Sequence, residues 1–277
     1  MRTREQKYEL FRSLHQRPGL FILPNPWDAG SAKILTALGF EALATTSAGY
    51  AFSVGLPDSA AAITREALLE NARSIADGTE LPVSADLQNG FGSSPDTCAE
   101  TILLAAKIGL VGGSIEDATG DPQNPIYELN HAIDRIAAAA EAAHDSHFFL
   151  TARAENFLYG HDDLDDTIRR LQAFAEAGAD VLYAPGLPDL EAIKKVCAAV
   201  PKPVNVLVGL KGATYSVEQL AAAGVKRVSV GGSFARAALG ALVRAALEVK
   251  NHGTFTYANE TLPHADATAF MSRSKPL

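Results

Sequence analysis

Residues 148–184 read FFLTARAENFLYGHDDLDDTIRRLQAFAEAGADVLYA, and this stretch contains one complete unit of a repeating pattern. Residues 148–152 form a short apolar run that predicts a strand, and residues 164–177 repeat apolar side chains at helical spacing. Gly178 follows the helical pattern as a terminating residue, and a second apolar run begins at residue 181. A strand, a helix and a second strand in this order are typical of a parallel βαβ unit.

The same unit recurs along the chain. Apolar runs predict strands at Leu20–Leu23, Ala42–Thr45, Val83–Ala85, Gly113–Ile115, Phe148–Ala152, Val181–Ala184, Val204–Val208 and Arg227–Val230. Helical patterns between them cover Ser31–Leu38, Arg65–Ile75, Pro95–Ile108, Ile133–Ala143, Leu164–Ala177, Leu187–Ala199 and Val217–Ala223. Strands and helices in this alternation fit an α/β fold of the closed (β/α)8 TIM barrel type, which commonly takes about 250 residues.

The 277 residues therefore predict a single domain, residues 1–277, with the barrel at about residues 18–233. An extra amphipathic helix is expected at residues 4–17, and an Ala- and Leu-rich helix at residues 234–250. The polar tail 251–277 is expected to be disordered or to lie against a neighbouring subunit. An open doubly wound sheet is the alternative fold, but its first turn should be a Gly-rich phosphate loop, whereas residues 25–30 read NPWDAG.

Composition argues against several classes of partner. The net charge is -8, the pI is near 5.4, and lysine and arginine do not cluster, so nucleic acid is not expected. The first residues lack the apolar stretch of a signal peptide, and no run reaches the roughly 20 apolar residues that span a bilayer. We therefore expect a cytoplasmic protein with no membrane partner. Two cysteines, Cys98 and Cys197, are too few for a disulfide framework or a cysteine-rich metal site.

Polar residues follow most of the expected strands. In such barrels the active site lies at the carboxyl ends of the strands, so these residues should share one mouth. They are Asn25, Trp27, Thr46, Ser47, Ala48, Gly49, Asp86, Gln88, Glu116, Asp117, Arg153, Glu155, Asn205 and residues 231–233.

Two acids in this set predict a metal site. Asp86 and Glu116 follow adjacent strands, where like charges are costly unless a cation neutralises them. Hard oxygen ligands without a histidine or cysteine cluster favour Mg²⁺ or Mn²⁺. The alternative is that each acid caps a helix or pairs with Arg153, and Glu155 could equally be the partner of that arginine. The small residues 45–49 could present backbone N–H groups to a carboxylate, or they could form an ordinary turn.

Six motifs together resemble the isocitrate lyase and phosphoenolpyruvate mutase superfamily. They are LPNPWDAGSA at 23–32, TTSAGY at 45–50, GLPD at 55–58, NGFG at 89–92, SIED at 114–117 and ARAE at 152–155. The resemblance covers roughly residues 15–250 and is specific as a combination, although it says little about which reaction of the superfamily occurs.

The resemblance implies a (β/α)8 barrel whose last helix, here residues 234–250, is exchanged between subunits of a homodimer or homotetramer. It also implies a magnesium site and a pocket for a small 2-oxo acid. By the pattern of the superfamily, Asp86 and Glu116 would hold Mg²⁺ with Gln88 and Asp58 nearby, and Arg153 would stabilise negative charge. The substrate would contact Ser47, Ala48, Gly49 and Asp86, with Trp27 and Asn205 lining the pocket.

Two departures from the pattern bear on the reaction. Gln88 stands where lyases and mutases of the superfamily typically carry a second acid, so one metal contact loses its charge. Residues 118–127 read ATGDPQNPIY, and they lack both the loop cysteine of the isocitrate and methylisocitrate lyases and the loop lysine of the mutases.

We therefore expect a metal-dependent carbon–carbon lyase, of the carboxy-lyase or oxo-acid-lyase type. It would act on a small 2-oxo or 2-hydroxy dicarboxylate through a metal-stabilised enolate, resembling the oxaloacetate decarboxylases of the superfamily. One alternative is the carbon–phosphorus chemistry of phosphonopyruvate hydrolase or the mutase, against which the missing lysine argues. Another is a protein with vestigial catalysis that binds a 2-oxo acid such as 2-oxoglutarate without turnover.

Overall fold

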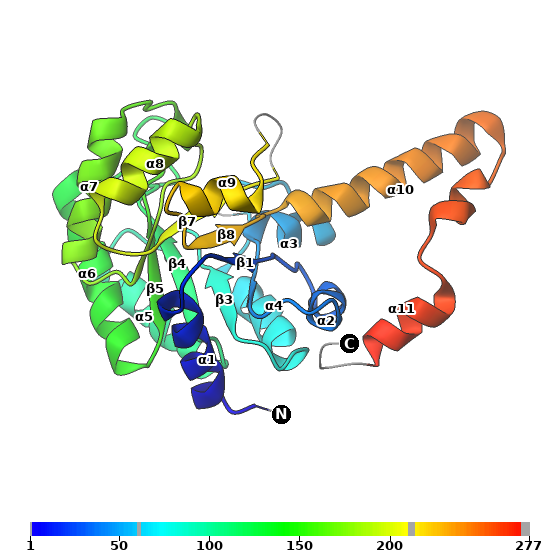
Figure 1. Ribbon diagram of the computed structural model, residues 1–277, viewed down its shortest axis with the longest axis horizontal. Coiled ribbons are helices and arrows are strands. Elements are labelled where there is room, and N and C mark those ends of the chain that lie inside the picture. Colours follow the sequence, from blue (N-terminus) through cyan, green and yellow to red (C-terminus); the bar gives the residue numbers. More distant parts are fainter. Residues whose placement is uncertain (1, 60–61, 210–213, 273–277) are drawn as a thin grey trace.

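Eight parallel strands surround one axis in the computed structural model, which describes residues 2–59, 62–209 and 214–272 (Figure 1). All eight expected strands are present, each within one residue of the expected bounds. They are β1 (Phe21–Leu23), β2 (Leu43–Ala44), β3 (Val83–Asp86), β4 (Gly112–Glu116), β5 (Phe149–Arg153), β6 (Val181–Tyr183), β7 (Val204–Leu207) and β8 (Arg227–Ser229).

The sheet closes on itself. Its strand order is β1-β8-β7-β6-β5-β4-β3-β2, so that the two ends of the order, β1 and β2, meet across the last seam. There the Ala44 amide donates to the Pro24 carbonyl at 3.0 Å, and the Asn25 side chain donates to the Thr45 carbonyl at 2.9 Å. The fold is therefore the expected (β/α)8 barrel.

Helices cover the outside of the sheet and return the chain from each strand to the next. The seven expected crossover helices are present as α2 (Ala29–Ala37), α4 (Arg65–Asp77), α5 (Pro95–Lys107), α6 (Leu129–Asp145), α7 (Leu164–Glu176), α8 (Leu190–Ala199) and α9 (Val217–Ala222). Most begin at a side chain that caps the free N–H groups of the first turn. Asp189, for example, accepts from the Ala192 amide, and Ser94 caps α5 just before Pro95. Short helices at Ser47–Ser53 (α3) and Asn156–Tyr159 (η1) were not expected.

Helix α1 (Arg4–Gln16), at the place expected for the N-terminal helix, packs against the amino ends of the strands. Phe11 and Leu14 of this helix form a cluster with Phe21 and Leu23 of β1, all of them at most 3% exposed. The main core lies between the outside of the sheet and the crossover helices. Since apolar packing occupies both of these regions, the polar strand ends at the opposite mouth are left for function.

His15 of α1 lies within this apolar cluster. Its ring stacks on Phe149 with centroids 4.8 Å apart, and its Nδ1 donates to the Phe11 carbonyl at 2.8 Å. Burial, with a smaller contribution from the positive charge of Arg227, lowers the pKa of His15 to about 3. The imidazole is therefore neutral at physiological pH.

Acid pH is expected to destabilise the fold through His15. Below about pH 6.5 His15 binds a proton in the unfolded chain but stays neutral in the native protein. Protonation therefore favours the unfolded chain, and the native protein loses stability as the pH falls. We expect the free energy of unfolding to fall by about 2 kcal/mol between about pH 6.5 and pH 5 from this group alone. Denaturant titrations across this range should show the slope, and His15→Phe should remove it. A slope unchanged in His15→Phe, but altered in the exposed control His252→Phe, would contradict the assignment.

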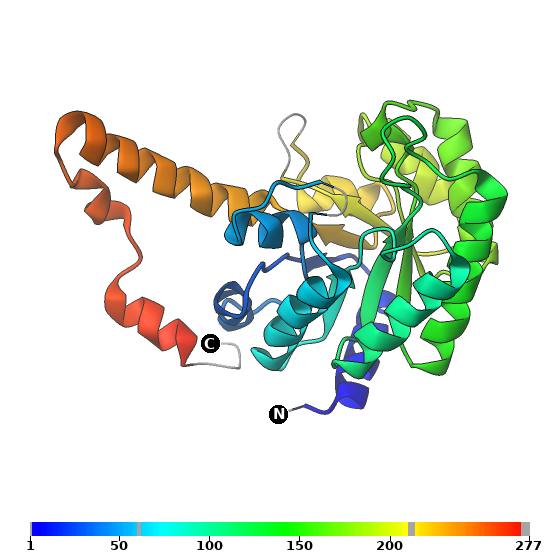
Figure 2. The same ribbon diagram turned by 180° about the vertical axis from the view of Figure 1, so that it is seen from behind.

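The chain beyond β8 leaves the barrel. Helix α10 (Ser233–His252) projects away from it, with Ala235 as its one buried residue (Figures 1 and 2). The tail was expected to be disordered or to lie against a neighbour, but its described part forms η2 (Thr256–Glu260) and α11 (His264–Met271). Helix α11 packs on α2 of the same chain, where Lys33 Nζ donates to the Met271 carbonyl at 2.7 Å. Residues 273–277 of the expected tail lie outside the described residues.

Among the helices of the described residues, none is long and apolar enough to cross a membrane.

Candidate active site

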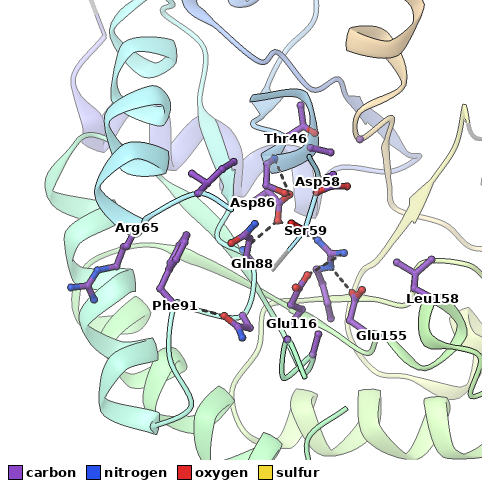
Figure 3. Close-up of a pocket in the computed structure, with 18 of the residues that line it drawn as sticks. Thr46, Asp58, Ser59, Arg65, Asp86, Gln88, Phe91, Glu116, Glu155 and Leu158 are labelled. Carbon is purple, nitrogen blue, oxygen red and sulfur yellow. Dashed lines mark hydrogen bonds and ion pairs between the residues drawn. The ribbon is translucent and has the colours of Figure 1, made fainter. Parts of the chain in front are cut away.

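A cavity of about 1250 Å³ opens at the carboxyl ends of the strands. It lies where the sequence placed the active site, and its volume suits a small ligand together with water. Seven of the ten residues that the resemblance assigns to the site line it: Ser47, Ala48, Asp58, Asp86, Gln88, Glu116 and Arg153. Figure 3 shows Asp86, Glu116 and Glu155 around its centre, with Asp58 and Gln88 beside them.

Arg153 joins three carboxylates at the floor of this cavity. Its Nε lies 2.7 Å from Glu155 Oε1, its Nη1 lies 3.3 Å from Asp86 Oδ1, and its Nη2 lies 3.3 Å from Glu116 Oε2. The guanidinium also lies over the Tyr183 ring, 4.9 Å from its centroid. The interpretation that the acids pair with Arg153 is thus confirmed, because Arg153 contacts Asp86, Glu116 and Glu155. Metal binding by Asp86 and Glu116 stays a prediction.

The Asp86 carboxylate is held from its other side by the first turn of α3. Oδ2 of Asp86 accepts from the Ser47 hydroxyl at 2.7 Å and from the Ser47 amide at 3.1 Å. The Asp86 amide in turn donates to Thr45 Oγ1 at 3.0 Å. These contacts fix the carboxylate at the end of β3 with its Oδ1 directed to Arg153.

Negative charge exceeds positive charge at the floor. Burial raises the pKa of Glu116 to about 8, and the nearby charges of Glu155 and Asp86 act in the same direction against the attraction of Arg153. Burial, followed by the charge of Asp86, also raises the pKa of Asp58. Burial alone would lower the pKa of Arg153, but the surrounding carboxylates raise it well above its usual range. Arg153 therefore stays charged, and its single positive charge is shared by the three carboxylates that contact it.

A second set of buried charges holds the strand ends in place. Asp117, 1% exposed, accepts from the Glu155 amide at 2.8 Å and pairs with Arg170 Nη1 at 3.1 Å. Burial raises the pKa of Asp117 to about 6. Arg170 also pairs with Asp166 on its own helix at 2.8 Å. This network connects the end of β4 to the residue that binds Arg153 Nε.

Arg135 of α6 supports the turn after β3 and was not singled out in the sequence. Its side chain is 1% exposed, and it donates to the carbonyls of Glu116, at 3.1 Å, and of Asn89 and Gly92. Gln88, with φ 50°, begins this turn in the left-handed region. The sequence signal for this role was an arginine on the core-facing side of an Ala-rich helix. Its partners could not be predicted, because they are backbone carbonyls and belong to no sequence motif.

Three of the ten residues that the resemblance assigns to the site, Trp27, Gly49 and Asn205, do not line the large cavity. Trp27 packs against Gly49 of α3. A Cβ added at Gly49 would come within 3.0 Å of the Trp27 Cβ. The Gly49 amide bonds to Thr46 Oγ1 at 3.2 Å, so it is not free for a substrate carboxylate. Asn205 is 2% exposed and binds Arg227 and Ser229 within the barrel. Glycine at residue 49 is therefore explained by close packing, and the expectation that the amides of residues 47–49 are free is wrong for Ser47 and Gly49.

The loop after β4 carries no thiol into the cavity. An isolated bridge between Ala118 and Ile126 closes this loop, and Thr119 Oγ1 donates to the Asn124 carbonyl at 2.6 Å. Ala118, Thr119 and Gly120 line the cavity. Of the two cysteines, Cys98 is buried beside Gly90 and Cys197 lies on α8.

The carboxylates of the cavity are the groups that could hold a metal ion. Within the described residues no group of three or more His, Cys, Asp or Glu side chains is arranged to hold one. Magnesium, however, is often bound by one or two carboxylates, with water and substrate as the other ligands. Asp86 and Glu116 meet that requirement, since both are carboxylates that line the cavity where water and substrate can reach them. The residues therefore fit a Mg²⁺ ion that shares its ligand shell with substrate.

Comparisons with known proteins agree with this architecture. A solved structure from Burkholderia cenocepacia J2315, provisionally described as a lyase or mutase, is 55% identical and covers 98% of both chains with a TM-score of 0.95. The 2-methylisocitrate lyase of Escherichia coli is 32% identical over 207 residues, which are 72% of this chain and 69% of the relative. An oxaloacetate acetylhydrolase in complex with 3,3-difluorooxalacetate is 25% identical, with a TM-score of 0.85 over 96% of this chain and 93% of that one.

The family model described as phosphoenolpyruvate phosphomutase matches residues 11–250, which include the whole barrel and most of α10. Relatives of this chain are thus enzymes of the superfamily that contains lyases and mutases. From the barrel, the site and these matches, the chain belongs to the phosphoenolpyruvate mutase family of the isocitrate lyase and phosphoenolpyruvate mutase superfamily.

Proposed function

We propose that this protein is a carbon–carbon lyase that decarboxylates or cleaves a small 2-oxo or 2-hydroxy dicarboxylate similar to oxaloacetate. The observation that carries the proposal is the position of Arg153, whose guanidinium contacts Asp86, Glu116 and Glu155 at the floor of a polar cavity. A fixed cation there suits negative charge that develops on a substrate oxygen.

We infer that Asp86 and Glu116 hold a Mg²⁺ ion, with Gln88 beside it. The ion would act as a Lewis acid toward the oxo and carboxylate oxygens of the substrate. Its binding would require both carboxylates to be ionised, and the loss of a proton from Glu116 accompanies it because burial raises the pKa of that group to about 8. Support comes from the phosphonopyruvate hydrolase structure of the same fold, which was solved with oxalate and Mg²⁺.

Two residues of the chain would then act on the substrate: Arg153 would stabilise charge and Asp58 would supply a proton. When the bond to the third carbon breaks, its electrons move into the oxo group, and Arg153 neutralises the oxygen that becomes an enolate. Carbon dioxide leaves without a proton donor. Asp58, whose pKa is raised by burial, would return a proton to the third carbon to give a 2-oxo acid.

The loop after β4 favours decarboxylation over cleavage to a larger acid. A leaving carbanion such as succinate needs an acid beside it, and in the described lining the loop presents Ala118, Thr119 and Gly120 at this place. Loss of carbon dioxide makes no such demand. The lysine expected for carbon–phosphorus chemistry is equally missing from residues 118–127.

Turnover assays separate the candidate reactions. Purified protein with oxaloacetate and Mg²⁺ should produce pyruvate, and chelation by EDTA should stop production. Phosphate release from phosphonopyruvate, with no pyruvate formed from oxaloacetate, would instead support the carbon–phosphorus reaction. Calorimetric binding of 2-oxoglutarate without any product in either assay would favour a binding protein. Oxaloacetate turnover that is indifferent to EDTA would contradict the metal-dependent reaction.

Restoring the second acid should strengthen metal binding. Gln88 lines the cavity close to Asp86, and Gln88→Asp adds one negative charge to the proposed ligand set. We expect the Mg²⁺ affinity to rise by roughly tenfold, since about 1.4 kcal/mol is a modest electrostatic gain near a divalent ion. Calorimetric titration with Mg²⁺ measures the change, and the isosteric variant Gln88→Glu tests whether position matters as well as charge. Equal affinity in Gln88→Asp and the wild type would place the ion elsewhere.

We also propose that α10 is exchanged between two copies of the chain. The apolar side chains of Leu242, Val243 and Leu247 on this projecting helix are between 48% and 64% exposed. A surface of this kind on a helix that leaves its own barrel suits burial in an oligomer. Sedimentation should therefore report a dimer or tetramer, and Leu242→Glu should shift it toward the monomer; a wild-type monomer would contradict the exchange.

A further inference from the structure

Arg227 of β8 lies in the middle of the barrel, below the active site. It is 4% exposed, and its Nε and Nη2 donate to Asn205 Oδ1 at 2.8 Å and to Thr151 Oγ1 at 2.9 Å. Its third nitrogen, Nη1, is buried and has no hydrogen-bond partner among the described residues. The interior of such a barrel is normally filled by branched apolar side chains, so a guanidinium here is unusual.

Within the described part of the chain, Arg227 belongs to no ion pair, and its two hydrogen-bond partners are neutral. Burial lowers the pKa of Arg227 to about 9, so the group still carries its charge at neutral pH. His15 of α1 lies near enough for the charge of Arg227 to act on it, but it supplies no counter-charge because its pKa is lowered to about 3 and it is neutral. A buried charge without a counter-charge is costly, and proteins rarely retain one.

A small cavity of about 60 Å³ lies beside this guanidinium. Hydroxyl groups of Ser84, Ser114 and Ser229, on three different strands, line it together with Arg227. Asp86 also borders the cavity, but Ser47 holds its Oδ2 and Arg153 holds its Oδ1. Arg153 lines the cavity as well, so two guanidinium groups border this space together with the serines and one carboxylate. A water molecule fills about 30 Å³ in the liquid, so the space holds one small anion or about two waters.

We propose that this interior cavity binds a small monovalent anion of the size of chloride, held by the Arg227 guanidinium and the serine hydroxyls around it. The anion would neutralise the buried arginine and give Nη1 its missing partner. The small cavity adjoins the proposed catalytic one, because Asp86 and Arg153 line both. The inference does not depend on the reaction that the enzyme catalyses.

Bromide serves as the probe because it replaces chloride and can be located by anomalous scattering. The full-length protein is purified in sodium gluconate, whose anion is too large for the cavity, and crystals are soaked in sodium bromide. We expect an anomalous peak in contact with Arg227 Nη1. Water density alone at this position, in crystals that show bromide elsewhere on the surface, would overturn the proposal.

Stability in solution gives a second readout. At constant ionic strength, replacing gluconate by chloride should lower the equilibrium constant for unfolding, by about 100-fold when chloride reaches 100 times its Kd. Arg227→Met, of similar length and without charge, should lose this dependence, whereas the exposed control Arg12→Met should keep it. The same dependence in Arg227→Met and in the wild type would overturn the site. If Arg227→Met fails to fold, the wild-type comparison of chloride with gluconate and the bromide peak still decide the question.

Discussion

Arg153→Ala is expected to lower kcat/KM for oxaloacetate by about 10³-fold, since removal of one electrostatic stabiliser of a developing oxyanion typically costs 10²- to 10³-fold and this one carries a full charge. The guanidinium contacts three carboxylates at 2.7 to 3.3 Å, so its loss also leaves Asp86, Glu116 and Glu155 to repel one another. Steady-state assays of pyruvate formation at saturating Mg²⁺ measure the effect.

Two further variants sharpen this test. Arg153→Lys keeps the charge but cannot reach three partners at once, so we expect it to recover part of the lost activity. Arg73→Ala removes an exposed arginine of α4 that pairs with Glu70, and its kcat/KM should match that of the wild type. Oxaloacetate turnover in Arg153→Ala within threefold of the wild type, with its fold intact, would remove Arg153 from the chemistry.

Asp117→Ala is expected to destabilise the fold by about 3 kcal/mol, because it leaves a buried arginine without one of its partners and a buried amide without an acceptor. Asp117 accepts from the Glu155 amide at 2.8 Å and pairs with Arg170 Nη1 at 3.1 Å. Arg170 keeps its second partner, Asp166, which limits the loss. Denaturant unfolding of the metal-free protein measures the difference.

Two further variants separate the contribution of the Asp117 charge from that of its hydrogen bond to the Glu155 amide. Asp117→Asn keeps an acceptor for the Glu155 amide and should cost less than Asp117→Ala. Asp134→Ala, at an exposed position of α6, should change the free energy of unfolding by less than about 0.5 kcal/mol. An Asp117→Ala protein as stable as the wild type would show that the network is not needed to hold the ends of β4 and β5.

The fold could be predicted from the sequence because its signals are local. Each strand is an apolar run, each crossover helix repeats its apolar positions, and most helices begin at a capping residue such as Asp189 or Ser94. The tail was different, because α11 owes its place to contacts with α2, and those depend on where α10 ends.

The candidate site was predicted in part, for a related reason. Asp86, Glu116 and Arg153 stand at the carboxyl ends of three neighbouring strands, so strand assignment alone brings them together. Trp27 follows β1 and Asn205 lies within β7, yet the first packs against Gly49 of α3 and the second binds Arg227 inside the barrel. Which way a side chain turns depends on its neighbours across the sheet, and a single sequence does not carry that information.

We propose that Asp86 and Glu116 share a divalent cation. Crystals grown with Mn²⁺ and oxalate, a stable analogue of a 2-oxo acid enolate, test it directly because manganese scatters anomalously. We predict one manganese peak in contact with both carboxylates and with oxalate. Oxalate bound at Arg153 without manganese, or manganese at another place in the barrel, would show that Asp86 and Glu116 do not share the ion.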